Sequence, residues 1–498
     1  MSITGKQNLK GYIKNILRKH WLFFVAFMGM AIYLKLSGSM VSWSGDAGSI
    51  WTTIKSFPSG NIIPSYVLYK GFAAIYPYLW FYQLSQFFGI GEFFFVKLFH
   101  CILFAYMSTV GFPYLVENLL HVKAKVWRKA LLMLFFFWFW KGNHAFDQLM
   151  VDLPSLAYFL LLVNSALKIS KFNSECLNIR RIGRYIYTGL LIGLNMCVSG
   201  QYTAAAICII LYLIIKTVPL KVLKEKAKRL GAILCIIVLV VCLEGVRLYN
   251  GYFEDTVIDP MREQGIPIAT NQQWLECDFM RLIGIGRNSP GPTIPDNRGL
   301  SIAKDLYGDQ YGDMYQKATA GGVSLTIGQY FKLVAKYPLD FLVRYADRLF
   351  FAFSPDGGRL SFSHLFLAYT LLFVPFVIFK KRCKTVRQFF SAKILIVLSF
   401  VFAIAASIIL NVEERFTMQI QGLIYALALL DDTLWDGFKC FGRTIKECCT
   451  KKTLRGLGER KFPFSFIVYL IFILFCFSHI ASLYSSIGID PANVLFSF

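Results

Sequence analysis

The stretch WLFFVAFMGMAIYLKL, residues Trp21–Leu36, is an apolar run that contains a single charged residue. A helix needs roughly 20 mostly apolar residues to cross the hydrocarbon core of a bilayer. Five basic and no acidic residues lie among the twenty residues before this run. Because positive residues concentrate on the cytoplasmic side, the pattern predicts an uncleaved first transmembrane helix with a cytoplasmic N-terminus.

The rest of the chain repeats this alternation of apolar runs and short basic blocks. The protein has 498 residues, 56% of them hydrophobic, with a mean hydropathy of +0.53 and a net charge of +23. The basic blocks hold 34 of the 52 Lys and Arg residues and only 7 acidic residues: 1–20, 121–129, 168–184, 216–229, 380–393 and 431–461. This distribution is the positive-inside pattern of a multi-pass membrane protein and argues against nucleic acid as a partner.

The apolar runs predict an all-α polytopic membrane protein with about eleven transmembrane helices. They are expected at about 21–36, 93–119, 130–140, 153–168, 185–198, 202–215, 230–248, 363–379, 394–410, 417–431 and 462–484. We expect three regions: an N-terminal transmembrane module at 1–248, a large extracytoplasmic loop region at 249–362 and a C-terminal module at 363–498. Aromatic residues and Pro77 between 41 and 91 favour interfacial helices in the first loop.

The first loop begins with VSWSGDAGSIWTTIKSFPSGNIIP, residues Val41–Pro64, which holds one carboxylate, Asp46. Two interpretations are open. Aspartate is a good N-cap residue, so Asp46 could cap an interfacial helix that starts near Ala47. Alternatively, Asp46 is a catalytic carboxylate where the membrane meets the extracytoplasmic side.

A second outside turn, KGNHAFDQLMVD, combines Lys141, His144, Asp147 and Asp152. An N-cap role would explain Asp152, because Leu153-Pro154 follows it and proline is tolerated in a first helical turn. That role does not explain Asp147. The turn is either an ordinary solvated connection or a set of catalytic and substrate-binding groups.

A third outside cluster holds Glu413, Glu414 and Arg415. It is either a solvated turn with a local ion pair or a site where the planar guanidinium of Arg415 binds a phosphate. Lys97 lies near the outer end of the second predicted helix, where it either contacts substrate or snorkels to the interface. Arg344 lies in the stretch 327–353, whose pattern predicts amphipathic helices on the membrane or packed on the core of the loop. Lys97 and Arg344 are further candidates for substrate binding.

The acidic first loop and the second acidic turn before a DLPS helix start resemble the GT-C superfamily of membrane glycosyltransferases. The likeness is closest to bacterial enzymes similar to protein O-mannosyltransferases and lipid A aminoarabinose transferases. It covers mainly residues 20–165, with a weaker echo at 411–425. The resemblance implies a sugar donor linked to polyprenyl phosphate. It also implies that Asp46 is the first-loop carboxylate and that Asp147 or Asp152 is the second acid. Asp46 is followed by Ala47, whereas the O-mannosyltransferases commonly carry an Asp-Glu pair.

The chemistry of such a transfer fits these residue types. A carboxylate accepts the proton of the acceptor hydroxyl, and cations hold the charge that develops on the leaving phosphate. The sequence leaves open whether a divalent metal, Mg²⁺ or Mn²⁺, bridges the acid and the phosphate. The expected partners are membrane lipid, the lipid-linked sugar and a glycan, lipid or protein acceptor, in the inner or plasma membrane.

Two other functions are open: a transporter or flippase of lipid-linked glycans, and a polymerase of such glycans. The glycosyltransferase interpretation makes a geometric prediction. Asp46, the turn with Asp147 and Asp152, and Arg415 should converge on one extracytoplasmic cavity.

Overall fold

In the computed structural model, every regular element of the described part of the chain is a helix, and no strand occurs there. The structure describes residues 3–41, 45–63, 68, 70–140, 145–170, 178–218, 225–266, 268, 305, 308, 326–353, 362–382, 391–409, 414–439, 442 and 464–486. The all-α prediction is therefore confirmed. The chain divides into two compact units, residues 1–268 and 269–498, which are described separately.

The described residues include five helices that are long and apolar enough to cross a membrane: Phe94–Leu120, Asp152–Ile169, Lys228–Glu263, Phe362–Arg382 and Phe466–Leu483. Four further apolar helices are shorter: His20–Leu36, Tyr202–Thr217, Lys393–Ala403 and Phe416–Leu430. The protein thus has the character of a multi-helix membrane protein. The count of eleven spans is not confirmed, because several apolar runs fold into helices below the length that a bilayer requires.

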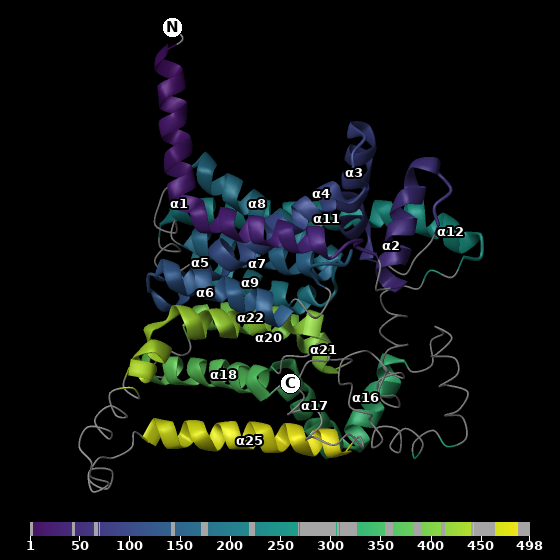
Figure 1. The fold of residues 1–498 in the computed structure, drawn as a ribbon. Helices are drawn as coiled ribbons and strands as arrows, with labels where there is room; N and C mark the ends of the chain where they lie inside the picture. The colour runs from purple at the N-terminus through teal and green to yellow at the C-terminus, as the bar shows by residue number, and fades with distance from the viewer. Residues whose placement is uncertain are drawn as a thin grey trace, which may run out of the picture. The chain divides into compact units, whose positions relative to one another are not determined.

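The first unit is a bundle of helices (Figure 1). Its α-helices are α1 (Ile3–Leu36), α2 (Gly45–Ser56), α3 (Phe72–Phe88), α4 (Phe94–Tyr106), α5 (Phe112–Leu120), α6 (Val126–Trp140), α7 (Asp152–Ile169), α8 (Ile179–Val198), α9 (Tyr202–Thr217), α11 (Lys226–Phe253) and α12 (Asp259–Glu263). A π-helical turn, η3 (Met107–Gly111), joins α4 to α5, and a second one, η5 (Glu254–Ile258), joins α11 to α12. The apolar part of α1 begins at a kink at His20.

Helices α8 and α11 approach closely because two glycines on α8 face α11. A Cβ atom at Gly189 would lie 2.5 Å from the carbonyl oxygen of Leu239, and one at Gly193 would lie 2.6 Å from Cβ of Val246. The two glycines are four residues apart and therefore share one helix face. This is the small-xxx-small arrangement that lets membrane helices pack backbone against backbone.

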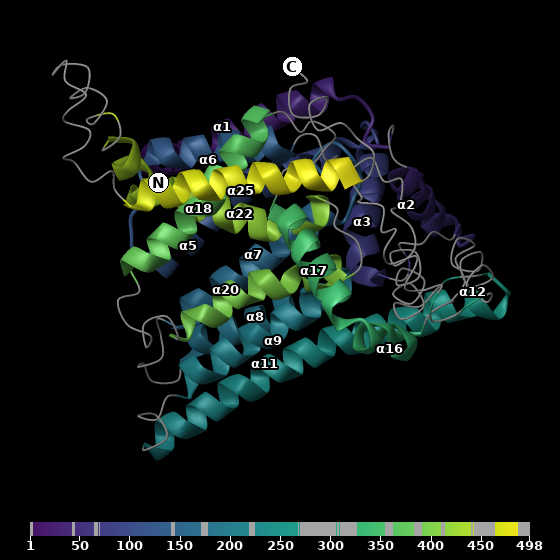
Figure 2. The same cartoon turned by 90° about the horizontal axis from the view of Figure 1, so that it is seen from below.

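One end of the first unit carries α2, α3 and α12, away from the kink in α1 (Figures 1 and 2). Their apolar side chains join residues of the connection before α7 in one buried cluster, which includes Ile54, Ile75, Val151 and Met261. The predicted interfacial region of the first loop is thus two helices, α2 and α3, that pack on the end of the bundle.

The second unit contains α16 (Ile327–Lys336), α17 (Pro338–Phe353), α18 (Phe362–Arg382), α20 (Lys393–Ala403), α21 (Ala405–Ile409), α22 (Glu414–Leu430) and α25 (Phe464–Ser486). Helices α18 and α25 pack through Leu365, Tyr369, Cys476 and Ile480, which are all buried. The single helix predicted at 394–410 is wrong. The chain leaves the helix at Ile404, so that α20 and α21 are separate helices.

A buried carboxylate ties the end of α22 to the end of α18. The Asp431 side chain is 1% exposed and accepts a hydrogen bond from Arg382 at its Oδ2 atom. Its Oδ1 atom accepts from the backbone N–H of Thr433 at 2.9 Å. Burial acts to raise the pKa of Asp431, but the bonds from Thr433 and Arg382 outweigh it and lower the pKa below its ordinary value of 3.8.

Asp431→Asn should destabilise the protein by about 2 kcal/mol at neutral pH, because it removes the charge that Arg382 neutralises. A lowered folded-state pKa contributes stability above the ordinary pKa of 3.8, and this contribution is lost as the pH falls through the folded value. The difference in thermal unfolding between the variant and the parent should therefore shrink only below about pH 4. Asp436→Asn is the control, since its ion pair with Lys381 is long, at 3.9 Å, and mostly exposed. An equal loss in both variants would contradict the assignment.

Candidate functional site

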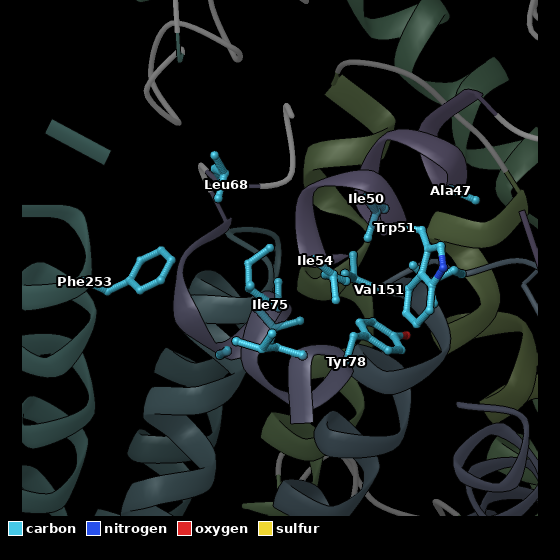
Figure 3. Packing of buried hydrophobic residues seen from close by; sticks show 14 of the residues in the cluster. Ala47, Ile50, Trp51, Ile54, Leu68, Ile75, Tyr78, Val151 and Phe253 are labelled. Atoms are coloured by element: carbon cyan, nitrogen blue, oxygen red, sulfur yellow. The ribbon is translucent and has the colours of Figure 1, made fainter. Parts of the chain in front are cut away.

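Helix α2 places Asp46 at the edge of a buried apolar face. The helix begins at Gly45, so Asp46 lies in the first helical turn and not at the N-cap of a helix that starts near Ala47. Ala47, Ile50 and Ile54 recur at helical spacing and are at most 1% exposed. Together with Trp51 they belong to the cluster that also contains Tyr78 and Val151, and Figure 3 shows Ile54 and Trp51 beside these two residues. Only the backbone of Asp46 is described, and its side chain lies outside the described residues.

The connection between α6 and α7 is joined to the start of the first loop by a direct backbone contact. The N–H of Leu149 donates a hydrogen bond of 2.9 Å to the carbonyl oxygen of Met40. Both residues are fully buried and belong to the same apolar cluster. From α1, the hydroxyl of Tyr33 donates to Oδ2 of Asp147 at 3.3 Å. The two stretches that the sequence singled out in this unit therefore lie together at one end of the bundle.

Two buried polar side chains hold the carbonyl groups on either side of Asp147. His100 of α4 lies 2.9 Å from the Phe146 carbonyl oxygen through Nδ1. Since a carbonyl can only accept, Nδ1 carries the proton. The hydroxyl of Tyr78 of α3 donates to the Met150 carbonyl oxygen at 2.7 Å. The two side chains also meet, with Tyr78 Oη 3.5 Å from His100 Nε2.

The ionisation of Tyr78 is suppressed by its surroundings. Burial raises the pKa of the Tyr78 hydroxyl well above its ordinary value, and the charges of Tyr158 and Asp152 raise it further. The group therefore stays protonated and keeps its hydrogen bond to Met150. We refer to Tyr78 and His100 together as the Tyr78–His100 brace.

Lys97 lies one turn before His100 on the same face of α4, and its side chain contacts the end of α1. Its Nζ atom donates to the carbonyl oxygens of Leu34 at 2.8 Å and Gly38 at 2.6 Å. These carbonyls lie at the C-terminal end of α1, where helix carbonyls have no intrahelical partner. A cation there also complements the helix dipole. A contact of Lys97 with substrate stays a prediction.

Asp152 is the first residue of α7 and is 8% exposed. The N-cap of α7 is Val151, so the N-cap role considered for Asp152 is wrong. A carboxylate in the first turn still interacts favourably with the helix dipole. The carbonyl oxygen of Asp152 also accepts a hydrogen bond of 2.9 Å from the hydroxyl of Ser155.

Gln148 is a polar residue of this connection that the sequence did not single out. Its side chain is 0% exposed, and neither amide atom has a hydrogen-bond partner within the described parts of the chain. An unsatisfied buried amide costs about 1–3 kcal/mol. Its place directly after Asp147 is the only sequence signal that could have identified it.

A small cavity lies beside the Tyr78–His100 brace. It is lined by Ala73, Ala74, Pro77, Tyr78, Phe99, Val151, Pro154, Tyr158 and Val198. Its volume of about 10 Å³ has room for roughly one water molecule. This cavity does not have the size of a sugar, and none of the predicted site residues lines it.

The other predicted site residues are described only in part. Lys141, His144 and Glu413 lie outside the described residues. Arg415 lies in the first turn of α22, and its side chain is not described. Because Arg415 belongs to the second unit, its convergence with the acids of the first unit stays a prediction.

Arg344 of α17 is 9% exposed, and its guanidinium lies over the ring of Phe341, 4.5 Å from the ring centroid. This contact is a cation–π interaction within the second unit. Among the described residues, no group of three or more His, Cys, Asp or Glu side chains is placed to hold a metal ion. A role of Arg344 in substrate binding and a role for Mg²⁺ or Mn²⁺ stay predictions.

Comparisons with protein families, with curated proteins and with solved structures find no match to this chain.

Proposed function

We propose that the protein is a membrane glycosyltransferase of the GT-C type. It would transfer a sugar from a polyprenyl-phosphate donor to an acceptor hydroxyl on the extracytoplasmic side of the inner or plasma membrane. The observation that carries the proposal is the hydrogen bond between Leu149 and Met40, which joins the connection containing Asp147 to the loop containing Asp46. Asp46 and Asp147, which are 101 residues apart in sequence, thus belong to segments that meet at one end of a helical bundle.

The proposed roles follow from the chemistry of the transfer. Asp46 accepts or orients the proton of the acceptor hydroxyl, which is the task of a general base. Asp147 or Asp152 supports it as the second acid. The leaving group is a phosphate, which is already acidic and needs no proton, so the remaining requirement is cationic stabilisation of its charge. We assign this task first to Arg415 and second to Lys141.

The location of the acids favours a reaction at the membrane surface. Tyr33, which contacts Asp147, lies one turn before the end of α1, and Asp152 begins a helix long and apolar enough to span a bilayer. A donor with a lipid tail presents its phosphate and sugar at the same depth as the ends of such helices. The acceptor, whether glycan, lipid or protein, would approach from the aqueous side.

A reconstituted assay tests this function directly. Proteoliposomes are loaded with a polyprenyl phosphate carrying one radiolabelled sugar, and soluble and lipid acceptors are supplied in turn. The expected result is label on an acceptor, with unlabelled polyprenyl phosphate released in equal amount. Movement of intact lipid-linked sugar between leaflets without transfer would overturn the proposal and favour a flippase. Joining of preassembled glycans, with no use of monosaccharide donors, would favour a polymerase.

A further inference from the structure

Helix α17 carries an apolar stripe on its outward face. Leu339, Leu342 and Val343 are 75%, 63% and 60% exposed, and Leu349 continues the same stripe at 37%. These positions follow the 3.6-residue period of a helix face. The opposite face turns inward with Phe341 and Arg344, which are 1% and 9% exposed. Exposing a contiguous apolar stripe of this kind to water is unfavourable. The stripe therefore requires an apolar or interfacial environment.

Helix α16, directly before α17, also carries an exposed apolar side chain, and it adds positive charge. Phe331 is 61% exposed, and the adjacent Lys332 is exposed together with Lys336, which lies one turn later on the same face as Lys332. The stretch 327–353 contains four basic and two acidic residues. An exposed aromatic ring beside lysines is typical of helices that lie in the headgroup region of a membrane.

The two helices form one rigid element. The hydroxyls of Tyr330 on α16 and Tyr345 on α17 are hydrogen-bonded, and the rings of Tyr330 and Phe341 meet edge to face at 5.6 Å. A capping box of Thr326 and Gln329 fixes the start of α16. The outward surface of α16 and α17 is therefore held in a defined orientation.

Contacts with two membrane helices set the depth of this element. Asp347 of α17 lies 3.0 Å from Nε2 of His479, which is seven residues before the end of α25. Phe350 lies against the ring of the same histidine at 4.8 Å and against Tyr369 of α18 at 5.6 Å. Tyr369 is seven residues after the start of α18. Both helices have the length and composition of membrane spans, so α17 lies at the boundary of the bilayer where α18 begins and α25 ends.

We propose that the outward face of α16 and α17 binds the surface of an anionic lipid bilayer. The stripe on α17 inserts at the boundary between headgroups and acyl chains, and Lys332 and Lys336 contact anionic headgroups. Electrostatic attraction favours such lysines at an anionic leaflet. This inference stands on the second unit alone and does not depend on glycosyl transfer.

Photo-crosslinking identifies what covers the stripe. The protein is made with p-benzoylphenylalanine in place of Leu342 and reconstituted into nanodiscs of phosphatidylglycerol and phosphatidylcholine. The expected product is a lipid adduct with phosphatidylglycerol over-represented relative to its share of the bilayer. In the Lys332→Gln and Lys336→Gln variants this enrichment should fall by roughly fivefold per lysine. Lys381→Gln, an exposed lysine at the other end of α18, is the charge-matched control and should leave the enrichment unchanged.

Every other product overturns the proposal. A crosslink to residues 1–268 would show that the first unit covers the stripe, and a crosslinked dimer would show a second copy. A lipid adduct with the same share of phosphatidylglycerol in all variants would exclude selection by the lysines. The probe in place of the buried Phe341 should crosslink only within the second unit, which verifies that α17 is folded.

Discussion

Asp46→Asn should lower sugar transfer by about 100-fold or more, which is the usual contribution of a general base. Asparagine has the size of aspartate but accepts no proton at neutral pH. Asp46 lies in the first turn of α2, where a carboxylate contributes only about 0.3–1 kcal/mol through the helix dipole. A large fall in turnover together with a small fall in stability is therefore the signature of a catalytic carboxylate at this position.

The measurement is the rate of label transfer in proteoliposomes, paired with thermal unfolding of the same preparation. Asp255→Asn is the matched control, because Asp255 is an exposed carboxylate in η5 of the same unit. Asp147→Asn and Asp152→Asn separate the two candidates for the second acid, since only the one that takes part in the reaction should reduce turnover. Undiminished transfer by a folded Asp46→Asn protein would remove Asp46 from the mechanism.

The apolar runs of the sequence were sufficient to predict the helices of the bundle. The helix predicted at 93–119 is observed at Phe94–Leu120. Helix α7 begins at Asp152, one residue before the predicted start at Leu153-Pro154. Length and hydropathy determine such elements locally. The break at Ile404 was not predictable in this way, because no glycine or proline lies between 394 and 410. The close packing of α8 on α11 had a local signal, the spacing of Gly189 and Gly193.

The candidate site was harder to predict than the helices, because contacts between segments distant in sequence determine it. The sequence identified Asp147 and noted Lys97, but it left open whether Lys97 snorkels or binds substrate. Its bonds to Leu34 and Gly38 cross about sixty residues and follow from the packing of α4 against α1. Tyr78 carried no distinguishing signal, since it is one of 26 tyrosines in the chain.

The Tyr78–His100 brace should be required for both stability and turnover. Tyr78→Phe and His100→Leu each remove one buried hydrogen bond, to the carbonyl of Met150 and of Phe146 respectively. The loss of a buried hydrogen bond costs about 1 kcal/mol, so each variant should unfold at a lower temperature than the parent. Because the two side chains are in contact, the double variant should deviate from the sum of the single effects.

The effect on turnover should exceed what unfolding alone explains. The brace fixes the backbone on both sides of Asp147, and a displacement of a reacting group by about 1 Å can cost about 100-fold in rate. Transfer is measured well below the unfolding temperature, where every variant is folded. Tyr82→Phe is the matched control: it makes the same change one turn later on α3, and the Tyr82 hydroxyl has no hydrogen bond to any residue that the structure describes. If Tyr78→Phe lost stability yet kept full turnover, the position of the Asp147 backbone would not matter for the reaction. The second acid would then have to be Asp152, which α7 itself holds in place.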